Sequence, residues 1–478
     1  MSSFVRRLFF CGTVVFHGIF LTGCMQTPGT FETLDDFRRK FLRRDSFPVQ
    51  VPEGVLTLKK AVETALLNNP SNLAAAQAVL AAGYGYRRAL SAYAPEINAS
   101  YSVGHTLSRG WDLKNPPVGV MKKNDHFVTE GTLHATLLLF DGFARELETI
   151  IAKEEYNKSR AAEKNVRRLL ERAVAYAYYD MLLAGEEIII NGEDLDFQKS
   201  ALQQAEVRFR NGHVSKASVL NFKILAARAE SNISSARYRR RVAFHALCAL
   251  MGCTPRQLPE NVVLQPVSTD LFPQLYNESF YLELAICHRP DLKMEKIALN
   301  IAYRNRQKAF ASFFPEIRLF SELSLATYNA DYGGYRVSDA HSRQGGFVYG
   351  GEITWNLFKG WDTVNKVRQQ KVLEKIAMWG LNTAFLEIAA EIRDARANCQ
   401  NARYQTRIFR DMAQWVREQR DLVFSEYLNG RETITRLNEA QSTLIEAQRK
   451  LAVSAIESNK AAAQLAAAAG IGLPQLRP

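Results

Sequence analysis

The sequence predicts an α+β membrane protein. In this fold, four strands from each of three copies form a 12-stranded transmembrane β-barrel, and long helices continue the barrel as a coiled-coil tube. Three observations predict it: the chain contains two internal repeats, each repeat has two segments of alternating apolar and polar residues, and each has a proline-free helical segment of nearly 70 residues. With 478 residues, 47% apolar and 23% charged, the chain has the composition of a folded protein.

The net charge of +12 does not by itself indicate a nucleic-acid partner. Lysine and arginine are spread along long helical stretches beside glutamate and aspartate. This pattern is typical of solvated helix faces. We therefore expect no nucleic acid among the partners.

The N-terminus has the composition of a secretory signal. Two arginines precede a short apolar segment at 8–20, which is too short to span a bilayer. The sequence Leu21-Thr22-Gly23-Cys24 resembles the lipobox of bacterial lipoproteins. This resemblance implies that the signal peptide 1–23 is removed and that Cys24 carries a lipid. Because Met25 rather than aspartate follows, the resemblance favours sorting to the outer membrane. An ordinary signal with a chance cysteine is the alternative.

Apart from Cys11 in the signal and Cys24, four cysteines are scattered on apolar helical stretches. They lack the CxxC and metal-ligand spacings, so we expect no metal and no cofactor other than the covalent lipid on Cys24. A disulfide is compatible with an oxidising compartment but is not predicted. These cysteines are Cys248, Cys253, Cys287 and Cys399.

The chain repeats itself, and a repeat of this kind decides the architecture. Pro70 and Pro290 are 220 residues apart, as are Pro95 and Pro315, and later landmarks recur 218 residues apart. A small loop deletion explains the change in spacing. The predicted division is a signal at 1–23, an extension at 24–55, repeat 1 at 56–254, a linker and equatorial segment at 255–280, repeat 2 at 281–470 and a tail at 471–478.

Each repeat begins with helices, at 56–94 and 281–313, followed by strands at 96–140 and 316–358. Proline suits the first turn of a helix and disfavours helical geometry in the residue before it. From Ile97, apolar and polar residues then alternate with the period of a strand. Strands of roughly 12 residues suit a tilted bilayer crossing. We expect polar loops at 109–126 and 328–345.

Four strands cannot close a barrel that has a lumen, and an open sheet edge cannot lie in lipid because its backbone groups would lack partners. The strands must therefore be shared between chains, and a trimer supplies 12. A soluble sandwich with one wet face is the alternative. Two separated hairpins make too small a sheet to bury the core of such a sandwich.

The helices after the strands, 143–252 and 361–469, supply the tube. Segments 144–210 and 362–428 are each roughly 100 Å long at 1.5 Å per residue. After Asn-Gly turns, the chain returns along shorter helices at about 214–251 and 432–469. Each shorter helix, stacked on the proline-started helix of its repeat, matches the long helix in length. A seven-residue spacing of large and small side chains indicates coiled-coil packing in the last helix: Leu437, Leu444, Leu451 and Leu465 with Ala440, Ala447, Ser454, Ala461 and Ala468.

Taken together, these motifs resemble TolC-like outer-membrane factors, and among them the lipidated drug-efflux branch. The resemblance runs from Leu56-Thr57-Leu58 through Asn69-Pro70 and both repeats. It implies a homotrimer with a barrel in the outer membrane of a Gram-negative-type cell and a 12-helix tube in the periplasm. Segments 56–67 and 281–288 resemble the equatorial belt of that family.

The resemblance also implies the function. The chain would be the outer-membrane exit duct of a tripartite efflux or type I secretion system. It would receive substrate from an inner-membrane pump of RND or ABC type through a periplasmic adaptor and conduct it passively, with outer-membrane lipid around the barrel. The adaptor would dock at the tips of the tube: Asn211, Gly212, His213, Val214, Asn429, Gly430, Arg431 and Glu432.

Relatives carry aspartates beyond the second tip that narrow the closed pore. The nearby residues here are Arg436, Asn438 and Glu439, so an acidic ring is not implied. A mixed Arg436/Glu439 constriction and ordinary solvated helix charges are both compatible with the sequence.

Two other classes compete with a duct. An enzyme is not predicted, since the chain lacks the HExxH, GxSxG, phosphate-loop and dinucleotide motifs in their structural context. A non-conducting structural coiled-coil lipoprotein of the outer membrane is the second class. The alternating strands argue against it, because a scaffold needs no lipid-facing rows.

Overall fold

The computed structural model describes residues 54–112, 120–253, 262–266, 275–331 and 340–473. The predicted signal at 1–23, Cys24 and nearly all of the extension 24–55 lie outside the described residues. Parts of 255–280 and of 471–478 lie outside them as well.

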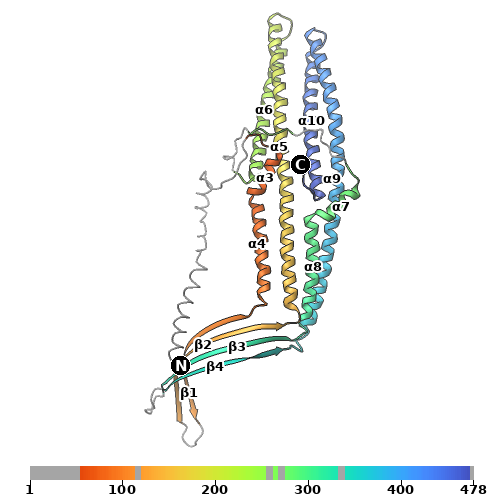
Figure 1. The fold of residues 1–478 in the computed structure, drawn as a ribbon. Helices are drawn as coiled ribbons and strands as arrows, with labels where there is room; N and C mark the ends of the chain where they lie inside the picture. Colours follow the sequence, from red (N-terminus) through yellow and green to blue (C-terminus); the bar gives the residue numbers. More distant parts are fainter. Residues whose placement is uncertain (1–53, 113–119, 254–261, 267–274, 332–339, 474–478) are drawn as a thin grey trace.

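The same order of elements occurs twice along the chain (Figure 1). The first set is α3 (Leu58–Asn68), α4 (Pro70–Ser91), β1 (Glu96–Asp112), β2 (Val120–Phe140), α5 (Ala144–Arg210) and α6 (Lys216–Leu250). The second set is α7 (Glu278–His288), α8 (Pro290–Ala311), β3 (Glu316–Asp331), β4 (Ala340–Thr354), α9 (Asp362–Leu428) and α10 (Ile434–Ala468).

The two 67-residue helices, α5 and α9, run the whole length of the helical part. At 1.5 Å per residue each is about 100 Å long, with the bounds that the sequence predicts. In Figure 1 the short helices are stacked in pairs beside them, α4 with α6 and α8 with α10, while α3 and α7 lie near mid-length. The stacking expected from helix lengths is therefore confirmed.

In each stack, the residue just before the proline-started helix donates a hydrogen bond to the C-terminal end of the helix stacked on it. We call this place the joint of the stack. Asn69, between α3 and α4, donates from Nδ2 to the Leu250 carbonyl at the end of α6, at 2.8 Å. Arg289, between α7 and α8, donates from Nη1 to the Ala468 carbonyl at the end of α10, at 2.9 Å. Helix-terminal carbonyls lack intrahelical partners, so these contacts satisfy groups that the breaks would otherwise leave unpaired.

The strands form one antiparallel sheet in the order β1-β2-β3-β4. An apolar row crosses the sheet through Ala99, Leu133, Leu323 and Phe347, which are register partners. The neighbouring row is Ser100, Thr132, Ser324 and Gly346. The sheet therefore has one apolar and one polar face, as the alternation predicts. None of the described helices has the length and apolar character needed to cross a membrane.

The strands differ from the sequence prediction in three respects. They are 15 to 21 residues long rather than about 12, because strand pairing continues through most of the expected loops 109–126 and 328–345. β2 also pairs with β3, so the two hairpins are not separate. Finally, the last strand ends at Thr354 rather than 358, since its partner strand begins at Glu316, after a proline that cannot donate to the ladder.

Two matching core clusters lie near mid-length, one in each repeat. The first joins α3, α5 and α6 around Tyr178, and the second joins α7, α9 and α10 around Ile392. The Tyr178 hydroxyl lies 3.0 Å from the Leu56 carbonyl and 2.9 Å from the Gln265 carbonyl, beside the parallel bridge of Leu56 with Leu264. Burial raises the pKa of Tyr178 to about 12.

The heptad seam of α10 is confirmed as a packing surface. Its leucines at 437, 444 and 465 are at most 5% exposed, while Leu451 is half-buried. Its small residues are buried as well: Ala440, Ala447, Ser454, Ala461 and Ala468. Small side chains allow the close approach of α10 to α9 and α5.

Gly252 and Gly212 provide a matched test of the joint. Both have left-handed backbones, with φ of +70° and +79°. A Cβ on Gly252 would lie 2.5 Å from the Asn68 carbonyl oxygen, whereas one on Gly212 would meet nothing within 4 Å. We expect Gly212→Ala to cost about 1 kcal/mol from backbone strain and Gly252→Ala about 2–4 kcal/mol, because overpacking is added. Thermal melting measures both, and equal losses would contradict this account of the joint.

Candidate functional site

The predicted tips are the two turns at the far end of the helical hairpins (Figure 1). Asn211 and Asn429 follow the last residues of α5 and α9, and Gly212 and Gly430 adopt φ of +79° and +75°. Glycine accepts this left-handed conformation without steric cost, which explains why both turns use Asn-Gly. The next amide closes each turn, from His213 to the Arg208 carbonyl and from Arg431 to the Glu426 carbonyl, at 2.8 and 2.9 Å.

The two turns present similar surfaces. In each, the first three of the four predicted residues are exposed, and the fourth, Val214 or Glu432, is half-buried. The side chains of Ser215 and Thr433 then cap the returning helices. The structure therefore brings all eight predicted docking residues to one end of the molecule.

Arg208 ties the first tip to the second. Its guanidinium donates to the carbonyls of Tyr427 and Leu428 and lies 5.3 Å from the centre of the Tyr427 ring. Leu437 and Phe222 are fully buried beside this contact. The two hairpins are thus held together by a cation over an aromatic ring and by an apolar cluster.

The three predicted constriction residues lie in the first turns of α10. Arg436 Nη1 is 2.9 Å from Glu439 Oε2, and both side chains are exposed. Asn438 is half-buried and is not part of this pair. The geometry brings Arg436 and Glu439 together as an ion pair within one helix, a type of pair that contributes little to stability.

Farther from the tips, polar contacts join the two hairpins. Asp194 Oδ1 accepts from Gln441 Nε2 at 2.8 Å and from Gln198 Nε2 at 3.1 Å. Gln448 Nε2 lies 3.3 Å from Glu193 Oε2. Water can replace such bonds when helices separate, at a small net cost. The sequence patterns do not predict this contact; the available signal is that Gln441 directly follows Ala440 of the heptad seam.

The joint of repeat 2 contains a charge network that the sequence patterns also miss. The Arg289 side chain is 5% exposed. Its guanidinium bonds to Asp291 at 2.6 Å and to Glu391 of α9 at 2.6 Å, in addition to the Ala468 carbonyl. From the other repeat, Arg168 of α5 donates to the Ala467 carbonyl at 2.6 Å. The network therefore connects both repeats at mid-length.

The charges of this network shift one another's pKa values. Burial alone would raise the pKa of Asp291, but the hydrogen bond and charge of Arg289 outweigh it and lower that pKa. Burial and the neighbouring Arg289 lower the pKa of Arg168. In repeat 1 the equivalent joint residue is the neutral Asn69, so the charged joint belongs to repeat 2 alone.

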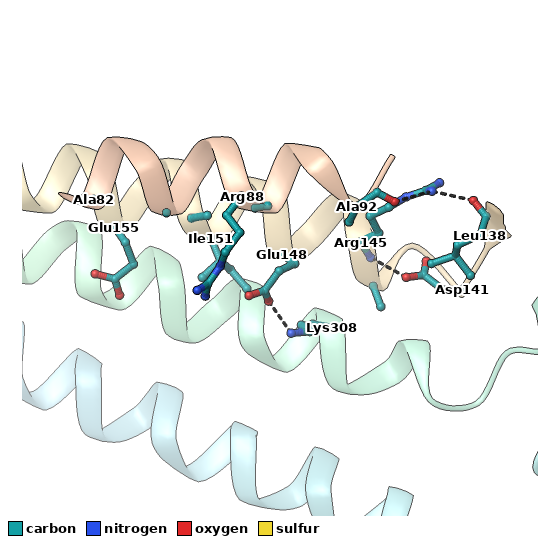
Figure 2. Close-up of a pocket in the computed structure, with 14 residues that line it drawn as sticks. Ala82, Arg88, Ala92, Leu138, Asp141, Arg145, Glu148, Ile151, Glu155 and Lys308 are labelled. Carbon is teal, nitrogen blue, oxygen red and sulfur yellow. Dashed lines mark hydrogen bonds and ion pairs between the residues drawn. The ribbon is translucent and has the colours of Figure 1, made fainter. Parts of the chain in front are cut away.

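A cavity of about 590 Å³ lies where the sheet meets the helices, lined by α4, α5 and Lys308 of α8 (Figure 2). Arg145 lies at the end of the cavity nearest the sheet. Its Nη1 donates to the Leu138 carbonyl at 2.7 Å, and its backbone amide donates to Asp141 Oδ2 at 2.8 Å. On the wall, Lys308 pairs with Glu148. These polar groups serve the strand-to-helix turn and helix packing. In the described part of the chain there is no cluster of three or more His, Cys, Asp or Glu residues placed to hold a metal.

Comparison with known proteins identifies the family. The family model of outer membrane efflux proteins matches residues 61–253 and again 281–471. The chain belongs to this family. The two matches coincide with the two sets of structural elements, so each repeat of the chain is one copy of the efflux-protein unit.

Two curated proteins are similar to part of this efflux protein. Toxin and drug export protein A of Aggregatibacter actinomycetemcomitans is 24% identical over 64% of this chain and 62% of its own length. An uncharacterized protein of Haemophilus influenzae is 25% identical over 56% of each chain. The chain thus spans about three fifths of the length of these relatives.

Solved structures share the fold over most of the efflux protein. CusC matches with a TM-score of 0.71 and 20% identity, covering 87% of this chain and 92% of that one. The outer membrane protein VceC of Vibrio cholerae matches with a TM-score of 0.71 and 18% identity, covering 87% and 96%. The CmeC outer membrane channel of Campylobacter jejuni matches with a TM-score of 0.73 and 16% identity, covering 88% and 87%.

Proposed function

We propose that three copies of this chain form the outer-membrane exit duct of a tripartite efflux or type I secretion system. Substrate enters the duct from an inner-membrane pump of RND or ABC type through a periplasmic adaptor. The duct conducts the substrate outward passively and catalyses no reaction. The observation that carries this proposal concerns the described part of the protomer: on both sides, its sheet ends in a strand with one partner strand and its helices expose apolar side chains.

The sheet edges are the first part of that observation. β1 and β4 each have a described partner on one side, so each presents a row of backbone donors and acceptors. The apolar face of the sheet is exposed, with side chains at least 42% accessible: Ile97, Tyr101, Val103, Leu107, Leu133, Leu139, Leu319, Leu323, Leu325, Phe347, Tyr349 and Ile353. A membrane accepts the apolar face but not the open edges. Pairing β4 of one copy with β1 of the next removes the edges, and three copies supply 12 strands.

The helices show matching edges. In the tip half, contacts place the helices in the order α6, α5, α10, α9; in the barrel half the order is α4, α5, α8, α9. The outer flank of α9 carries apolar residues seven apart, Ile408, Trp415 and Leu422, which are 42%, 66% and 67% exposed. The opposite flank of the protomer, on α6 and α4, also exposes apolar residues: Leu220, Ile224, Tyr238, Val242, Leu73, Leu80 and Tyr84. Packing α9 against α6 and α4 of the next copy buries both flanks in a seam between protomers.

The remaining parts of the proposal concern anchoring and partners. Cys24 carries a lipid that anchors the chain in the outer membrane beside the barrel, and the tube extends into the periplasm. The exposed turns from Asn211 and from Asn429 dock the adaptor. The name of the Aggregatibacter relative, a toxin and drug export protein, supports an export role.

Electrical recording tests conduction directly. The purified protein, added to a planar lipid bilayer, should give stable steps of ionic current. A protein that inserts into the bilayer in its assembled form and carries no current would overturn the proposal.

The competing structural lipoprotein makes a different prediction for Cys24→Ala. A coiled-coil scaffold held by its lipid alone becomes soluble when the lipid is lost. The barrel of a duct still needs detergent, because its apolar sheet face remains. Release of this variant into detergent-free buffer would favour the scaffold.

The Arg436–Glu439 pair gives a prediction for the pore. If the pair lines a constriction, the charge-reversed variants Arg436→Glu and Glu439→Arg should change single-channel current and ion selectivity in opposite directions, because a fixed charge in a narrow pore attracts counter-ions. Arg393→Glu, which changes an exposed pair with Glu278 near mid-length, is the matched control. Unchanged current and selectivity in both pore variants would mean that the pair is an ordinary surface contact.

A further inference from the structure

Two cysteines occupy the turn that ends α6. The helix ends at Leu250, and Gly252 adopts φ of +70°. The Cys253 amide then donates to the Cys248 carbonyl at 3.0 Å. This bond defines a Schellman motif, in which the side chains at these two positions frequently lie in contact. The turn therefore brings the two side chains together through its backbone geometry.

Both thiols lie inside the core of repeat 1. Cys248 is 0% exposed and Cys253 is 6% exposed. Cys253 Sγ lies 3.5 Å from the Cys248 carbonyl oxygen, and the two thiols share a hydrogen bond that lowers the pKa of Cys253. Both thiols are free in the structure, and the shared backbone turn holds the two residues next to each other.

Repeat 2 shows that the turn does not need thiols. There, Gly470 has φ of +73° and the Ile471 amide donates to the Ala466 carbonyl at 3.0 Å. Ala466 and Ile471 stand at the positions that cysteines occupy in repeat 1. Apolar residues are therefore sufficient for packing at this turn. The two thiols of repeat 1 can in addition be oxidised.

We propose that Cys248 and Cys253 are joined by a disulfide bond in the mature protein. This inference rests on the proposed function, which places the tube in the periplasm, an oxidising compartment. The oxidant is a protein disulfide of that compartment. The Cys253 thiolate attacks one of its sulfurs and forms a mixed disulfide; the Cys248 thiolate then displaces the oxidant as a thiol. Two protons and two electrons leave the chain, and one S–S bond forms.

The short separation in sequence favours this bond before the core closes. The two cysteines are five residues apart and follow one another in chain order among the cysteines, so the loop that must close is small. The loop can therefore close before the core packs, and burial then shields the bond from reductants.

The bond would brace the joint of repeat 1. The carbonyl of Leu250 accepts from Asn69, and Gly252 lies against the backbone of Asn68. A cross-link over this turn holds the end of α6 in the conformation in which its last carbonyl accepts the hydrogen bond from Asn69. Repeat 2 braces the corresponding joint with the charges of Arg289 instead.

Alkylation followed by mass spectrometry tests the proposal. The full chain is purified from cell envelopes without reductant, after an acid quench, then denatured and treated with iodoacetamide. Trypsin releases Cys248 and Cys253 in a single peptide, 242–256. We expect this peptide to be unmodified and lighter by two hydrogens, while Cys287 and Cys399 are alkylated. Prior treatment with dithiothreitol should make all four cysteines react.

Variants and fractionation separate the possible failures. In Cys253→Ala, Cys248 should become alkylated without reductant, whereas Cys287→Ser should leave the pair protected. Alkylation of both cysteines in unreduced protein from the outer membrane would overturn the disulfide and leave the proposed function standing. A chain that fractionates with the cytosol would overturn both.

Discussion

Replacing Trp415 with glutamate is expected to dissociate the assembly into protomers. Trp415 is 66% exposed in the protomer and lies at the centre of the apolar row of α9 in the tip half. In the proposed ring of three copies, its burial would contribute roughly 2 kcal/mol at each of the three seams. Glutamate removes this contribution and adds the cost of burying an unpaired charge, so the effect is repeated around the ring.

Size-exclusion chromatography with light scattering in detergent measures this result, and circular dichroism verifies that the helices persist. Trp415→Phe keeps an apolar side chain and is the matched control, expected to stay assembled. A glutamate variant that keeps the oligomer of the unaltered protein would mean that this flank of α9 is not an interface.

The second large effect is expected for Arg289→Leu. The substitution leaves Asp291 with Arg168 and Glu391 with Arg172 as the remaining charged partners, and it frees the Ala468 carbonyl. Removing one member of a buried charge network costs about 3–5 kcal/mol. Arg393→Leu is the control, because the Arg393–Glu278 pair is exposed and such pairs contribute below about 1 kcal/mol. Hydrogen exchange in the last turn of α10 measures the loss, and similar exchange in the two variants would contradict a structural role for the network.

The Arg289 effect should also depend on pH. The pKa of Asp291 is lowered in the folded protein, so its contribution to stability is present above the ordinary value of 3.8 and is lost as pH falls below it. The difference between Arg289→Leu and the unaltered protein should therefore shrink on acidification through this range. A difference that stays constant down to strong acid would show that Asp291 is not part of the stabilising contact.

The helices were predictable because their limits have local causes. Pro70 and Pro290 mark the start of α4 and α8, and the Asn-Gly turns at 211 and 429 mark the ends of α5 and α9. Each signal acts on the backbone conformation of one or two residues, so it can be identified without knowing the rest of the fold.

The strand limits were less predictable because pairing across a hairpin overrides local composition. The polar segment 109–126 has the composition of a loop, yet residues 109–112 and 120–126 continue the register of β1 and β2. A strand that extends beyond a membrane into water no longer needs apolar residues, and its alternation then ends before its hydrogen bonds do.

Contacts between distant segments could not be predicted from spacing. Arg289 and Glu391 are 102 positions apart, and Asp194 and Gln441 are 247 apart. Nothing in the local sequence of either residue specifies its partner. The tips, by contrast, were predicted because the same turn residues place them at the ends of the two longest helices.

Electron microscopy of the detergent-purified protein tests the central claim most directly. We predict end views with three-fold symmetry and side views of a tube of about 100 Å attached to a shorter barrel. Monomers, or flexible rods without a barrel, would contradict the account of a duct built from three copies.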